Sequence, residues 1–464
     1  MKRLLLVLIL SLVITPQLFA QTQIGKAVFA RGITTAETGG GDVRVLGAEA
    51  AIFEGDMLTT GEKSFVVIEF DDGTRMSLRP NTIFHLEKFK QAENQAEVRL
   101  HSGGLRASTG SISKLNPEGF KLHARNTTTI VRDADFDVRL CQEECEQEAE
   151  NYQVQQKPSA FVVGRVAEIK GTLTITSNTQ YSRLAVKGAP LYQGDTLLSG
   201  KDAYAVLAFR DKGRITIQAE TTFKIDTLQF EQTSGGQDKA LFDLIQGGLR
   251  ALTGLIGEEN KEAYQVNTPV ATIGIRGTGF DLVCVGNCVA PGSKEISDTA
   301  ILAMGDGLFA SVWEGAISIK TDVGEVVLTK GSVVIVPDKG SKPKALPETP
   351  PFIDDNPAPR PDKVLINHEN LFSSYPIKTY RFGLFFAVYK GHLTTTETDK
   401  KYLDLGIEEA SRYDVDKDGN LLRLDRIPPL LRNDPYFKSI DESFWENYDF
   451  LDENFDDYFE CTIL

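Results

Sequence analysis

The chain has 464 residues, of which 41% are hydrophobic and 25% are charged, and its formal net charge at pH 7 is −15. This length allows about three domains of ordinary size, each able to bury its own core. Because an acidic surface repels phosphate backbones, the composition argues against nucleic acid as a partner.

The amino terminus is typical of a secretory signal peptide. Lys2 and Arg3 precede an apolar run from Leu4 to Ile14, and the small residue Ala20 follows soon after. The run is shorter than the roughly 20 apolar residues that a membrane span needs. We therefore expect residues 1–20 to be removed on export to the periplasm or beyond, and no membrane span in the mature chain.

Two long stretches of the sequence repeat one another in the same order. IFEGDMLTTG at 52–61 matches LYQGDTLLSG at 191–200, and the register continues without a gap as far as 75–78, after which the second copy has a small insertion. The other matching pairs are 64–70 with 203–209, 75–78 with 214–217, 103–106 with 247–250, and 135–137 with 279–281. We interpret residues 24–146 as a first domain and residues 161–340 as a second, joined by a polar linker at 147–160.

Within each copy the apolar residues alternate with polar ones, as the half-buried face of a strand requires. Met76 and Leu78 follow this alternation, and Ile215 and Ile217 repeat it at the matching positions. Short strands separated by Gly-Asp, Asp-Gly and Thr-Gly turns predict an all-β fold, arranged as tandem β-sandwich or β-roll domains.

The rest of the chain is expected to form smaller units. GLFASVWEG at 307–315 resembles GLFFAVYKG at 383–391, and we interpret each as part of a β-hairpin that caps a domain. The proline-rich segment 341–363 predicts an extended, semi-rigid linker. Residues 364–464 would then form a C-terminal hairpin region that ends in an amphipathic helix.

The motifs in this order resemble the FecR domain family. The family's most distinctive stretch corresponds to TPVATIGIRGTGFD at 268–281, whereas the counterpart at 127–137 lacks the proline and the glycines, which indicates a divergent first copy. The resemblance covers roughly residues 24–340. It implies exported β-domains used in interaction or regulation, with iron-uptake signalling as the founding example. The founding type adds a cytoplasmic anti-sigma segment and a membrane span, which we do not recognise here, so we expect no direct control of a sigma factor.

The five cysteines include two pairs with the same spacing. Cys141 and Cys145 follow one Phe-Asp strand, and Cys284 and Cys288 follow the other, so a local disulfide in each copy is the natural outcome of export. A four-thiolate zinc site and a disulfide between the copies are the alternatives. Cys461 has no obvious partner.

One acidic segment follows the spacing of an EF-hand calcium loop. The oxygen ligands would be Asp414, Asp416, Asp418, Asn420 and Asp425, with a glycine at the sixth position. The twelfth position holds aspartate in place of the longer glutamate, and a double proline soon after would break an exit helix. Calcium is the one cofactor that the sequence suggests, and the alternative is a solvated hairpin turn.

The C-terminal tail places aromatic residues at helical spacing and fills the other face with Asp and Glu. Phe444, Tyr448 and Phe455 mark the apolar face. One interpretation is an amphipathic helix docked on its own β-domain. The other is a docking segment for a partner protein, in which these aromatic side chains are the anchors.

We recognise no catalytic signature in the sequence. We therefore expect a non-enzymatic binding or scaffold module of the cell envelope, whose partner is an envelope protein or a glycan. A periplasmic sensor or regulator of a separately encoded membrane signalling protein is an alternative of the same class. The alternative of another class is an enzyme with an unrecognised carboxylate site, for which Asp56, Asp195 and Asp211 in predicted turns would supply the acids.

Overall fold

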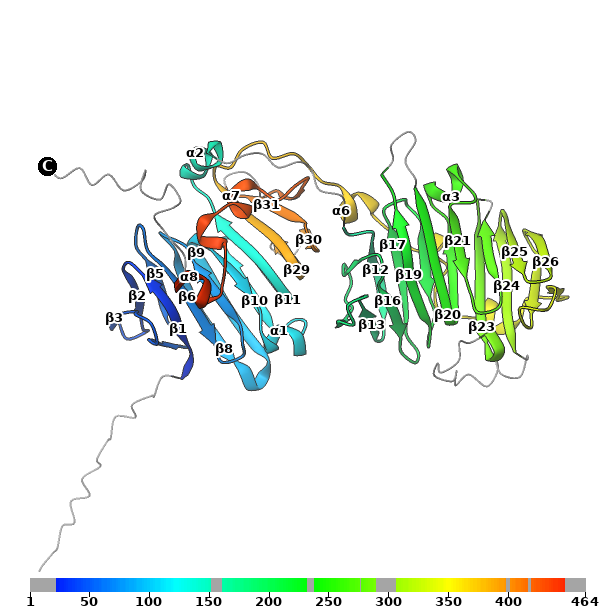
Figure 1. The fold of residues 1–464 in the computed structure, drawn as a ribbon, viewed down its shortest axis with the longest axis horizontal. Coiled ribbons are helices and arrows are strands. Elements are labelled where there is room, and N and C mark those ends of the chain that lie inside the picture. Colours follow the sequence, from blue (N-terminus) through cyan, green and yellow to red (C-terminus); the bar gives the residue numbers. More distant parts are fainter. Residues whose placement is uncertain are drawn as a thin grey trace, which may run out of the picture.

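The computed structural model describes residues 22–151, 161–231, 238–275, 277–288, 306–397, 401–415 and 419–446. It confirms the all-β prediction, because strands dominate and the helices are short. Figure 1 shows two β bodies lying side by side. Strands from both ends of the described chain, coloured blue to cyan and orange, belong to one body, and the green to yellow strands between them make the other.

In the described residues the first copy begins with eleven strands, two short α-helices and one 3-10 helix, most of the strands antiparallel to their neighbours. They are β1 (Gln23–Arg31), β2 (Thr34–Glu37), β3 (Val43–Val45), β4 (Ala51–Phe53), β5 (Met57–Thr60), β6 (Phe65–Phe70), β7 (Arg75–Leu78), β8 (Ile83–Lys90), η1 (Gln91–Glu93), β9 (Gln95–Ser108), α1 (Ser111–Leu115), β10 (Phe120–Ala124), β11 (Thr127–Leu140) and α2 (Glu144–Glu150).

The second copy repeats this order and then continues. Its elements are β12 (Gly164–Lys170), β13 (Leu173–Thr176), β14 (Ser182–Leu184), β15 (Pro190–Leu191), β16 (Thr196–Ser199), β17 (Tyr204–Phe209), β18 (Arg214–Ile217), β19 (Thr222–Gln229), β20 (Lys239–Leu252), α3 (Leu255–Glu259), β21 (Tyr264–Asn267), β22 (Thr272–Ile275), β23 (Gly279–Val285), η2 (Gly286–Cys288), β24 (Gly307–Glu314), β25 (Ala316–Thr321), β26 (Gly324–Thr329), β27 (Val333–Val336) and β28 (Lys344–Ala345).

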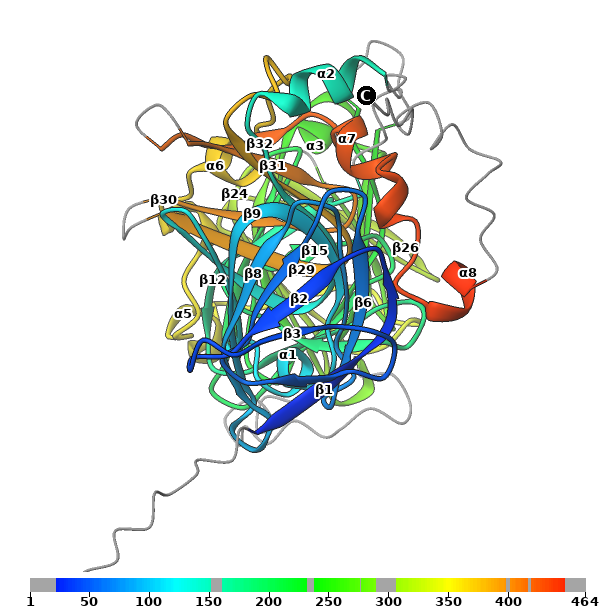
Figure 2. The ribbon, with the colours of Figure 1, turned by 90° about the vertical axis from the view of Figure 1, so that its left-hand side faces the viewer.

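The C-terminal part of the described chain returns to the first copy. Its elements are α5 (Pro351–Asp354), η3 (Pro361–Lys363), α6 (His368–Phe372), β29 (Gly383–Glu397), β30 (Lys401–Leu405), β31 (Ala410–Asp414), β32 (Leu421–Leu424), α7 (Pro429–Arg432), η4 (Pro435–Phe437) and α8 (Glu442–Glu446). Figure 2 looks at the first body from its outer end and shows the red segment with α7 and α8 running along the side of that body.

Strand β29 belongs to the sheet of the first copy, although the whole second copy lies between them in the sequence. It pairs antiparallel with β11, from Thr127 opposite Glu397 to Leu140 opposite Leu384. Strands β30 and β31 pair with β29, and β32 extends the sheet. Residues 364–464, which we expect to contain a C-terminal hairpin region, contribute β29 to β32, and this hairpin completes the first copy. The second copy is inserted between β11 and β29.

In the second copy the corresponding hairpin follows its own β23, and no domain is inserted between them. Strand β24 pairs with β23 as β29 pairs with β11. Together β24 and β25 correspond to the single strand β29, with Gly315 and Gly391 at the same place. Both glycines have positive φ, 67° and 77°, a conformation that glycine adopts without strain. The likeness of 307–315 to 383–391 thus marks equivalent strands of the two copies.

Residues 350–361 do not form a free linker, which corrects the expectation from their composition. Helix α5 follows Pro350, and Ile353 is fully buried against Val283 and Phe309 of the second copy. A second double proline begins the stretch 428–437, in which α7 buries its leucines against the first copy. We call residues 350–361 and 428–437 the two straps. Each covers the face of its sheet that is turned away from the main core.

The main core of each copy is built from the alternating apolar residues of its strands. Met76 and Leu78 in the first copy and Ile215 and Ile217 in the second are buried, as their alternation predicts. Among the described residues, no helix is long and apolar enough to cross a lipid bilayer.

Candidate functional site

The two copies meet at a buried cluster of charged residues. Arg165 on β12 is completely buried, and its guanidinium forms an ion pair with Glu409, which directly precedes β31. The same guanidinium donates hydrogen bonds to the backbone carbonyls of Leu371, at 2.9 Å, and Gly188, at 3.1 Å. An arginine of the second copy is therefore held by residues that complete the first copy and by the segment that connects them.

Glu409 lies at the centre of this cluster. Its Oε1 atom is 3.6 Å from Arg210 and 3.4 Å from Arg423, and its Oε2 atom accepts a 2.8 Å hydrogen bond from the backbone N–H of Gly406. Burial alone would raise the pKa of this carboxyl group. The positive charges of Arg165 and Arg423 outweigh burial, so the pKa of Glu409 lies below its ordinary value and the group stays ionised.

Two further contacts fix how closely the copies approach. The backbone N–H of Ile407 donates a 2.9 Å hydrogen bond to the hydroxyl of Tyr192, whose pKa is raised by burial. Gly188 lies against Asp404, where a Cβ atom would come within 2.0 Å of the carboxylate, and its φ is +86°. Position 188 therefore requires glycine both for its conformation and for the space.

A histidine and an aspartate complete the polar side of the junction. The Nε2 atom of His392 lies 3.0 Å from Oδ1 of Asp404, and the hydroxyl of Thr394 donates to the same oxygen at 2.7 Å. Burial lowers the pKa of His392 to about 4 even though Asp404 works in the opposite direction. The imidazole is therefore neutral at pH 7.

A cavity of about 160 Å³ opens beside this cluster. It lies between β12, the segment that leads into α6, and the strands β30 and β32. Its charged lining comes from Arg165, Lys187, Asp404 and Arg423. Because both copies and the connecting segment contribute to its wall, the cavity exists only while the two copies are docked.

Each strap is held by an arginine on the reverse face of its sheet. In the first copy Arg106 donates a 2.6 Å hydrogen bond to the backbone carbonyl of Phe437 and lies 3.6 Å from Asp137. The hydroxyl of Tyr389 donates to Asp137 at 2.7 Å. Burial raises the pKa of Asp137 to about 7, although Arg106 opposes the shift.

The second copy repeats this arrangement, but its aromatic residue is a tryptophan, stacked on an arginine, rather than a tyrosine. Arg250 donates hydrogen bonds to the backbone carbonyls of Ala358 and Ile353 in the strap and lies 3.4 Å from Asp281. The guanidinium of Arg360 stacks on Trp313, 3.9 Å from the ring centroid. The straps are therefore equivalent parts of the two copies, each held through carbonyls rather than by a β ladder.

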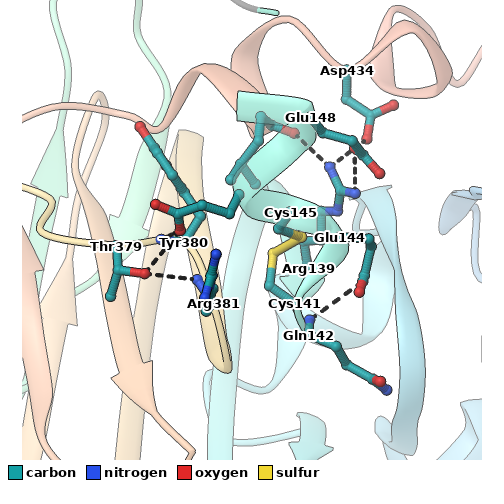
Figure 3. The surroundings of a disulfide bond; sticks show 12 residues. Arg139, Cys141, Gln142, Glu144, Cys145, Glu148, Thr379, Tyr380, Arg381 and Asp434 are labelled. Carbon is teal, nitrogen blue, oxygen red and sulfur yellow. Dashed lines mark hydrogen bonds and ion pairs between the residues drawn. A yellow bond between two sulfur atoms is a disulfide. The ribbon is translucent and has the colours of Figure 1, made fainter. Parts of the chain in front are cut away.

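The expected cysteine pairs lie at disulfide distance. The sulfur atoms of Cys141 and Cys145 are 2.17 Å apart, and those of Cys284 and Cys288 are 2.16 Å apart. Figure 3 shows the first pair beside Arg139, at the point where α2 turns back over the sheet. This geometry differs from both the zinc site and the disulfide between copies. Cys461 lies outside the described residues.

The first disulfide fixes a helix that joins three parts of the first copy. On α2, Glu148 forms an ion pair with the buried Arg139 of β11, and Asp434 of the strap lies 3.7 Å from the same guanidinium (Figure 3). Glu146 accepts hydrogen bonds from the Thr379 hydroxyl and the Tyr380 backbone, each at 2.8 Å. The helix thus connects β11, the strap and the entry to β29.

The aspartates considered as catalytic acids hold turns. Asp56 accepts hydrogen bonds from Arg44 and from the Phe53 backbone, and Asp195 does the same with Arg183 and the Tyr192 backbone. Asp211 accepts from the Gly213 backbone, and burial raises its pKa to about 6. In these positions a carboxylate fixes the adjoining turn, before Asp56 and Asp195 and after Asp211, which accounts for its presence without catalysis.

Of the proposed calcium ligands, Asp414, Asn420 and Asp425 are described, and they lie along a β-hairpin rather than between two helices. Asp414 ends β31 opposite Asn420, while Asp425 follows β32 at the other end of the hairpin. Because Asp425 is five residues beyond Asn420, the two aspartates are separated by about 16 Å of strand and do not converge on one ion. Each pairs with an arginine, Asp414 with Arg412 and Asp425 with Arg426. Asp416 and Asp418 lie outside the described residues, so binding at the turn itself stays a prediction.

The described start of the tail packs on the first copy. Trp445 on α8 is buried against Phe65, with ring centroids 4.8 Å apart, and Phe444 stands edge-on to Trp445 with 37% of its surface exposed. Tyr448 and Phe455 lie outside the described residues. The chain is therefore anchored on the first copy up to residue 446.

Sequence reasoning missed the junction residues Arg165, Arg423 and Glu409. They lie far apart in the sequence, and no motif links them. One usable signal was the pattern of the hairpin: residues 383–391 match the second copy's 307–315, but no hairpin of that kind directly follows the first copy's Phe-Asp strand. That gap could have indicated a divided first copy, and hence a close junction.

The fold and these sites define a duplicated β protein in which one copy is inserted into the other. The sequence matches the FecR protein family over residues 56–154 and 195–333, just over half of the chain. The chain therefore belongs to the FecR family, and the two matched segments fall in the two copies.

Two solved structures are similar to part of the chain. Both are crystal structures of a protein described as a putative anti-sigma factor from Parabacteroides distasonis ATCC 8503, at 2.50 Å and 1.65 Å resolution. They share 14% and 12% sequence identity with this chain, and both have a TM-score of 0.24. The matches cover 34% of this chain and 62% of the solved chains. No curated protein matches the sequence.

Proposed function

We propose that this protein is an exported, non-enzymatic binding module of the cell envelope that presents a rigid pair of FecR domains to another macromolecule. The observation that carries the proposal is the inserted architecture. Buried charges at the junction fix the two domains in one arrangement, and a strap covers each domain on its own sheet. Such a body offers a fixed pair of surfaces, which suits recognition of a macromolecule.

The edge strands are the part of this body best suited to a protein partner. Strand β3 lies at the end of its sheet, with Val43 and Val45 exposed over 62% and 71% of their surfaces. The matching strand β14 of the second copy exposes 51% of Leu184. An extended segment of an envelope protein can add to such an edge through backbone hydrogen bonds while its side chains cover the apolar residues.

Affinity capture tests the proposal. The mature protein is used to capture proteins from an envelope extract, and the captured protein is identified, purified and titrated against variants. Replacing both Val43 and Val45 with Lys should weaken binding by more than tenfold. The control replaces Leu115, an exposed apolar residue on the short helix α1, with Lys and should bind normally. Equal binding by both variants would contradict the edge as the docking site.

A regulator of a separately encoded membrane protein is the second candidate, and membership of the FecR family favours it. The identity of the captured protein separates the two: a membrane signalling protein supports the regulator, and a structural envelope protein supports the scaffold. A glycan partner would give no captured protein. A carboxylate enzyme is less well supported, because Asp56, Asp195 and Asp211 hold turns in the structure.

Export itself is tested by the intact mass of the protein from its native host. We expect a chain that lacks residues 1–20, within a residue or two of that boundary. Recovery of the full-length chain from the cytosol would contradict export.

A further inference from the structure

The cavity at the junction has a positive surrounding in a chain that is strongly negative. Arg165, Arg210, Arg423 and Lys187 bring four positive charges, and the carboxylates of Asp404 and Glu409 bring two negative ones. The neighbouring histidine is neutral at pH 7. The cluster therefore holds an excess of two positive charges, whereas the whole chain has a net charge of −15.

This excess of positive charge changes the pKa of a buried residue of the cluster. Arg423 is 3% exposed, and burial together with the repulsion of Arg165 and Arg210 lowers its pKa to about 10, against the attraction of Glu409. Its Nε atom has no well-formed hydrogen bond among the described residues and faces Glu409 Oε1 at 3.4 Å. In such a low-dielectric place an added negative charge is attracted more strongly than at an exposed surface.

Lys187 stands at the cavity with its charge available. Its ammonium group lies 5.9 Å from the ring centroid of Tyr402, which also lines the cavity. Among the described residues, no carboxylate lies within ion-pair distance of the Lys187 ammonium group. The side-chain amides of Asn367 and Asn370 line the same cavity and can donate hydrogen bonds to an anion.

The rest of the lining selects among anions. Val166, Ala167, Leu365, Ile366 and Leu371 add apolar side chains to the lining of the cavity. A volume of about 160 Å³ corresponds to roughly five water molecules at about 30 Å³ each. A small organic acid can contact the apolar lining with its short carbon chain and the polar lining with its planar anionic groups, whereas inorganic phosphate contacts only the polar lining.

We propose that this cavity binds a small organic carboxylate with a short carbon chain, held by Lys187 and the two asparagine amides and attracted by the positive charge of Arg423, whose terminal N–H groups donate to backbone carbonyls. Because residues of both copies line the cavity, the bound anion stabilises their docked arrangement by binding only to it. This inference concerns a small molecule and is independent of the macromolecular partner proposed above.

Titration of the mature protein with succinate tests the proposal. Isothermal calorimetry and thermal unfolding are measured with succinate, with its uncharged analogue succinamide, and with inorganic phosphate, all at matched ionic strength. We expect saturable binding at one site and a higher unfolding temperature with succinate, and neither effect with succinamide. Phosphate should bind more weakly than succinate. Phosphate bound as tightly as succinate would overturn the assignment to a carboxylate.

Two variants locate the binding. Lys187→Gln should weaken succinate binding by about fivefold or more, because it removes a charge at the cavity. Lys170→Gln changes an exposed lysine at the end of β12, outside the cavity, and should bind as the unaltered protein does. Asn370→Asp replaces an exposed amide of the lining with a negative charge and should abolish binding without unfolding the junction. The absence of saturable succinate binding, or equal weakening by the two lysine variants, would overturn the proposal.

Discussion

Arg79, directly after β7, and Asp434 in the strap form an ion pair of 3.0 Å between the first third of the chain and its end. The carboxylate is fully buried, and the guanidinium is almost so. The second copy has Gln218 and Asn356 at the corresponding places, joined by a neutral hydrogen bond of 3.1 Å. The same contact between sheet and strap is therefore made with charges in one copy and without them in the other.

This difference predicts unequal effects of removing the strap residue. Asp434→Ala leaves Arg79 and Arg139 without their buried carboxylate and should lower the free energy of unfolding of the first copy by about 3 kcal/mol. Asn356→Ala removes a neutral hydrogen bond and should cost about 1 kcal/mol. Denaturant unfolding of both variants measures the difference. Equal losses would show that the buried charges do not stabilise the first strap.

A second prediction concerns truncation. A chain that ends at Lys342 loses β29, so β11 becomes an open edge and the reverse face of the first copy is uncovered. We expect this chain to aggregate or to lose its cooperative melting transition. Residues 161–363 keep the second copy with its own strap and should melt cooperatively alone. A soluble first copy in the shorter chain would contradict the divided fold.

The sequence contained most of the architecture of one copy and little of how the copies are combined. Alternation at Met76 and Ile215 identified the strands, and the matched turns identified the repeat. The pairing of β29 with β11 leaves no periodic signal, because it joins segments with an entire domain between them. Proline content pointed to a linker at 341–363, since composition alone does not reveal that Ile353 meets a complementary apolar face.

The site divides in the same way. Cysteine spacing located the two pairs that lie at disulfide distance, because both partners are close in sequence. The contact of Arg165 with Glu409 at the junction could not be predicted from the sequence, since neither residue is unusual in its local pattern. The spacing of the calcium loop matched a helical motif, yet the strands around it place Asp414 and Asp425 at opposite ends of a hairpin.

The raised pKa of Asp137 predicts a dependence of stability on pH. Because its pKa in the folded protein is about 7, above the ordinary value of 3.8, the folded state binds this proton more tightly than the unfolded state. The resulting stabilisation is complete below pH 3.8 and is lost as the pH rises through about 7. The free energy of unfolding should therefore fall over this window.

Asp137→Asn stays uncharged at every pH and keeps an acceptor for the Tyr389 hydroxyl, so this decline should become shallower. Asp281 and Asp211, with pKa values raised to about 6, act in the same direction and remain in the variant. Exposed Asp202→Asn is the control and should leave the decline unchanged. Chemical denaturation at a series of pH values measures how the free energy of unfolding declines. An unaltered decline in Asp137→Asn would contradict the role of Asp137.

The first disulfide should stabilise the protein modestly. Non-reducing peptide mapping should link Cys141 to Cys145 and Cys284 to Cys288. Replacing Cys141 and Cys145 with Ala opens a very short loop, for which chain entropy gives about 2 kcal/mol. Hydrogen exchange in α2 should accelerate, because the helix then depends on Glu146 and Glu148 alone. A link between Cys141 and Cys284 would contradict the local pairing.

The last prediction separates anchoring from docking in the C-terminal tail. Trp445 is buried against Phe65, so Trp445→Ala should lower the free energy of unfolding by about 3 kcal/mol. Phe444 is its more exposed neighbour, and Phe444→Ala should cost well under 1 kcal/mol. If the tail docks on a partner, replacing Phe444 together with Tyr448 and Phe455 should abolish capture of that partner while the melting temperature stays constant, because aromatic anchors dominate binding energy. Retained capture by this triple variant would show that the tail only covers its own domain, and binding would then have to come from the edge strands.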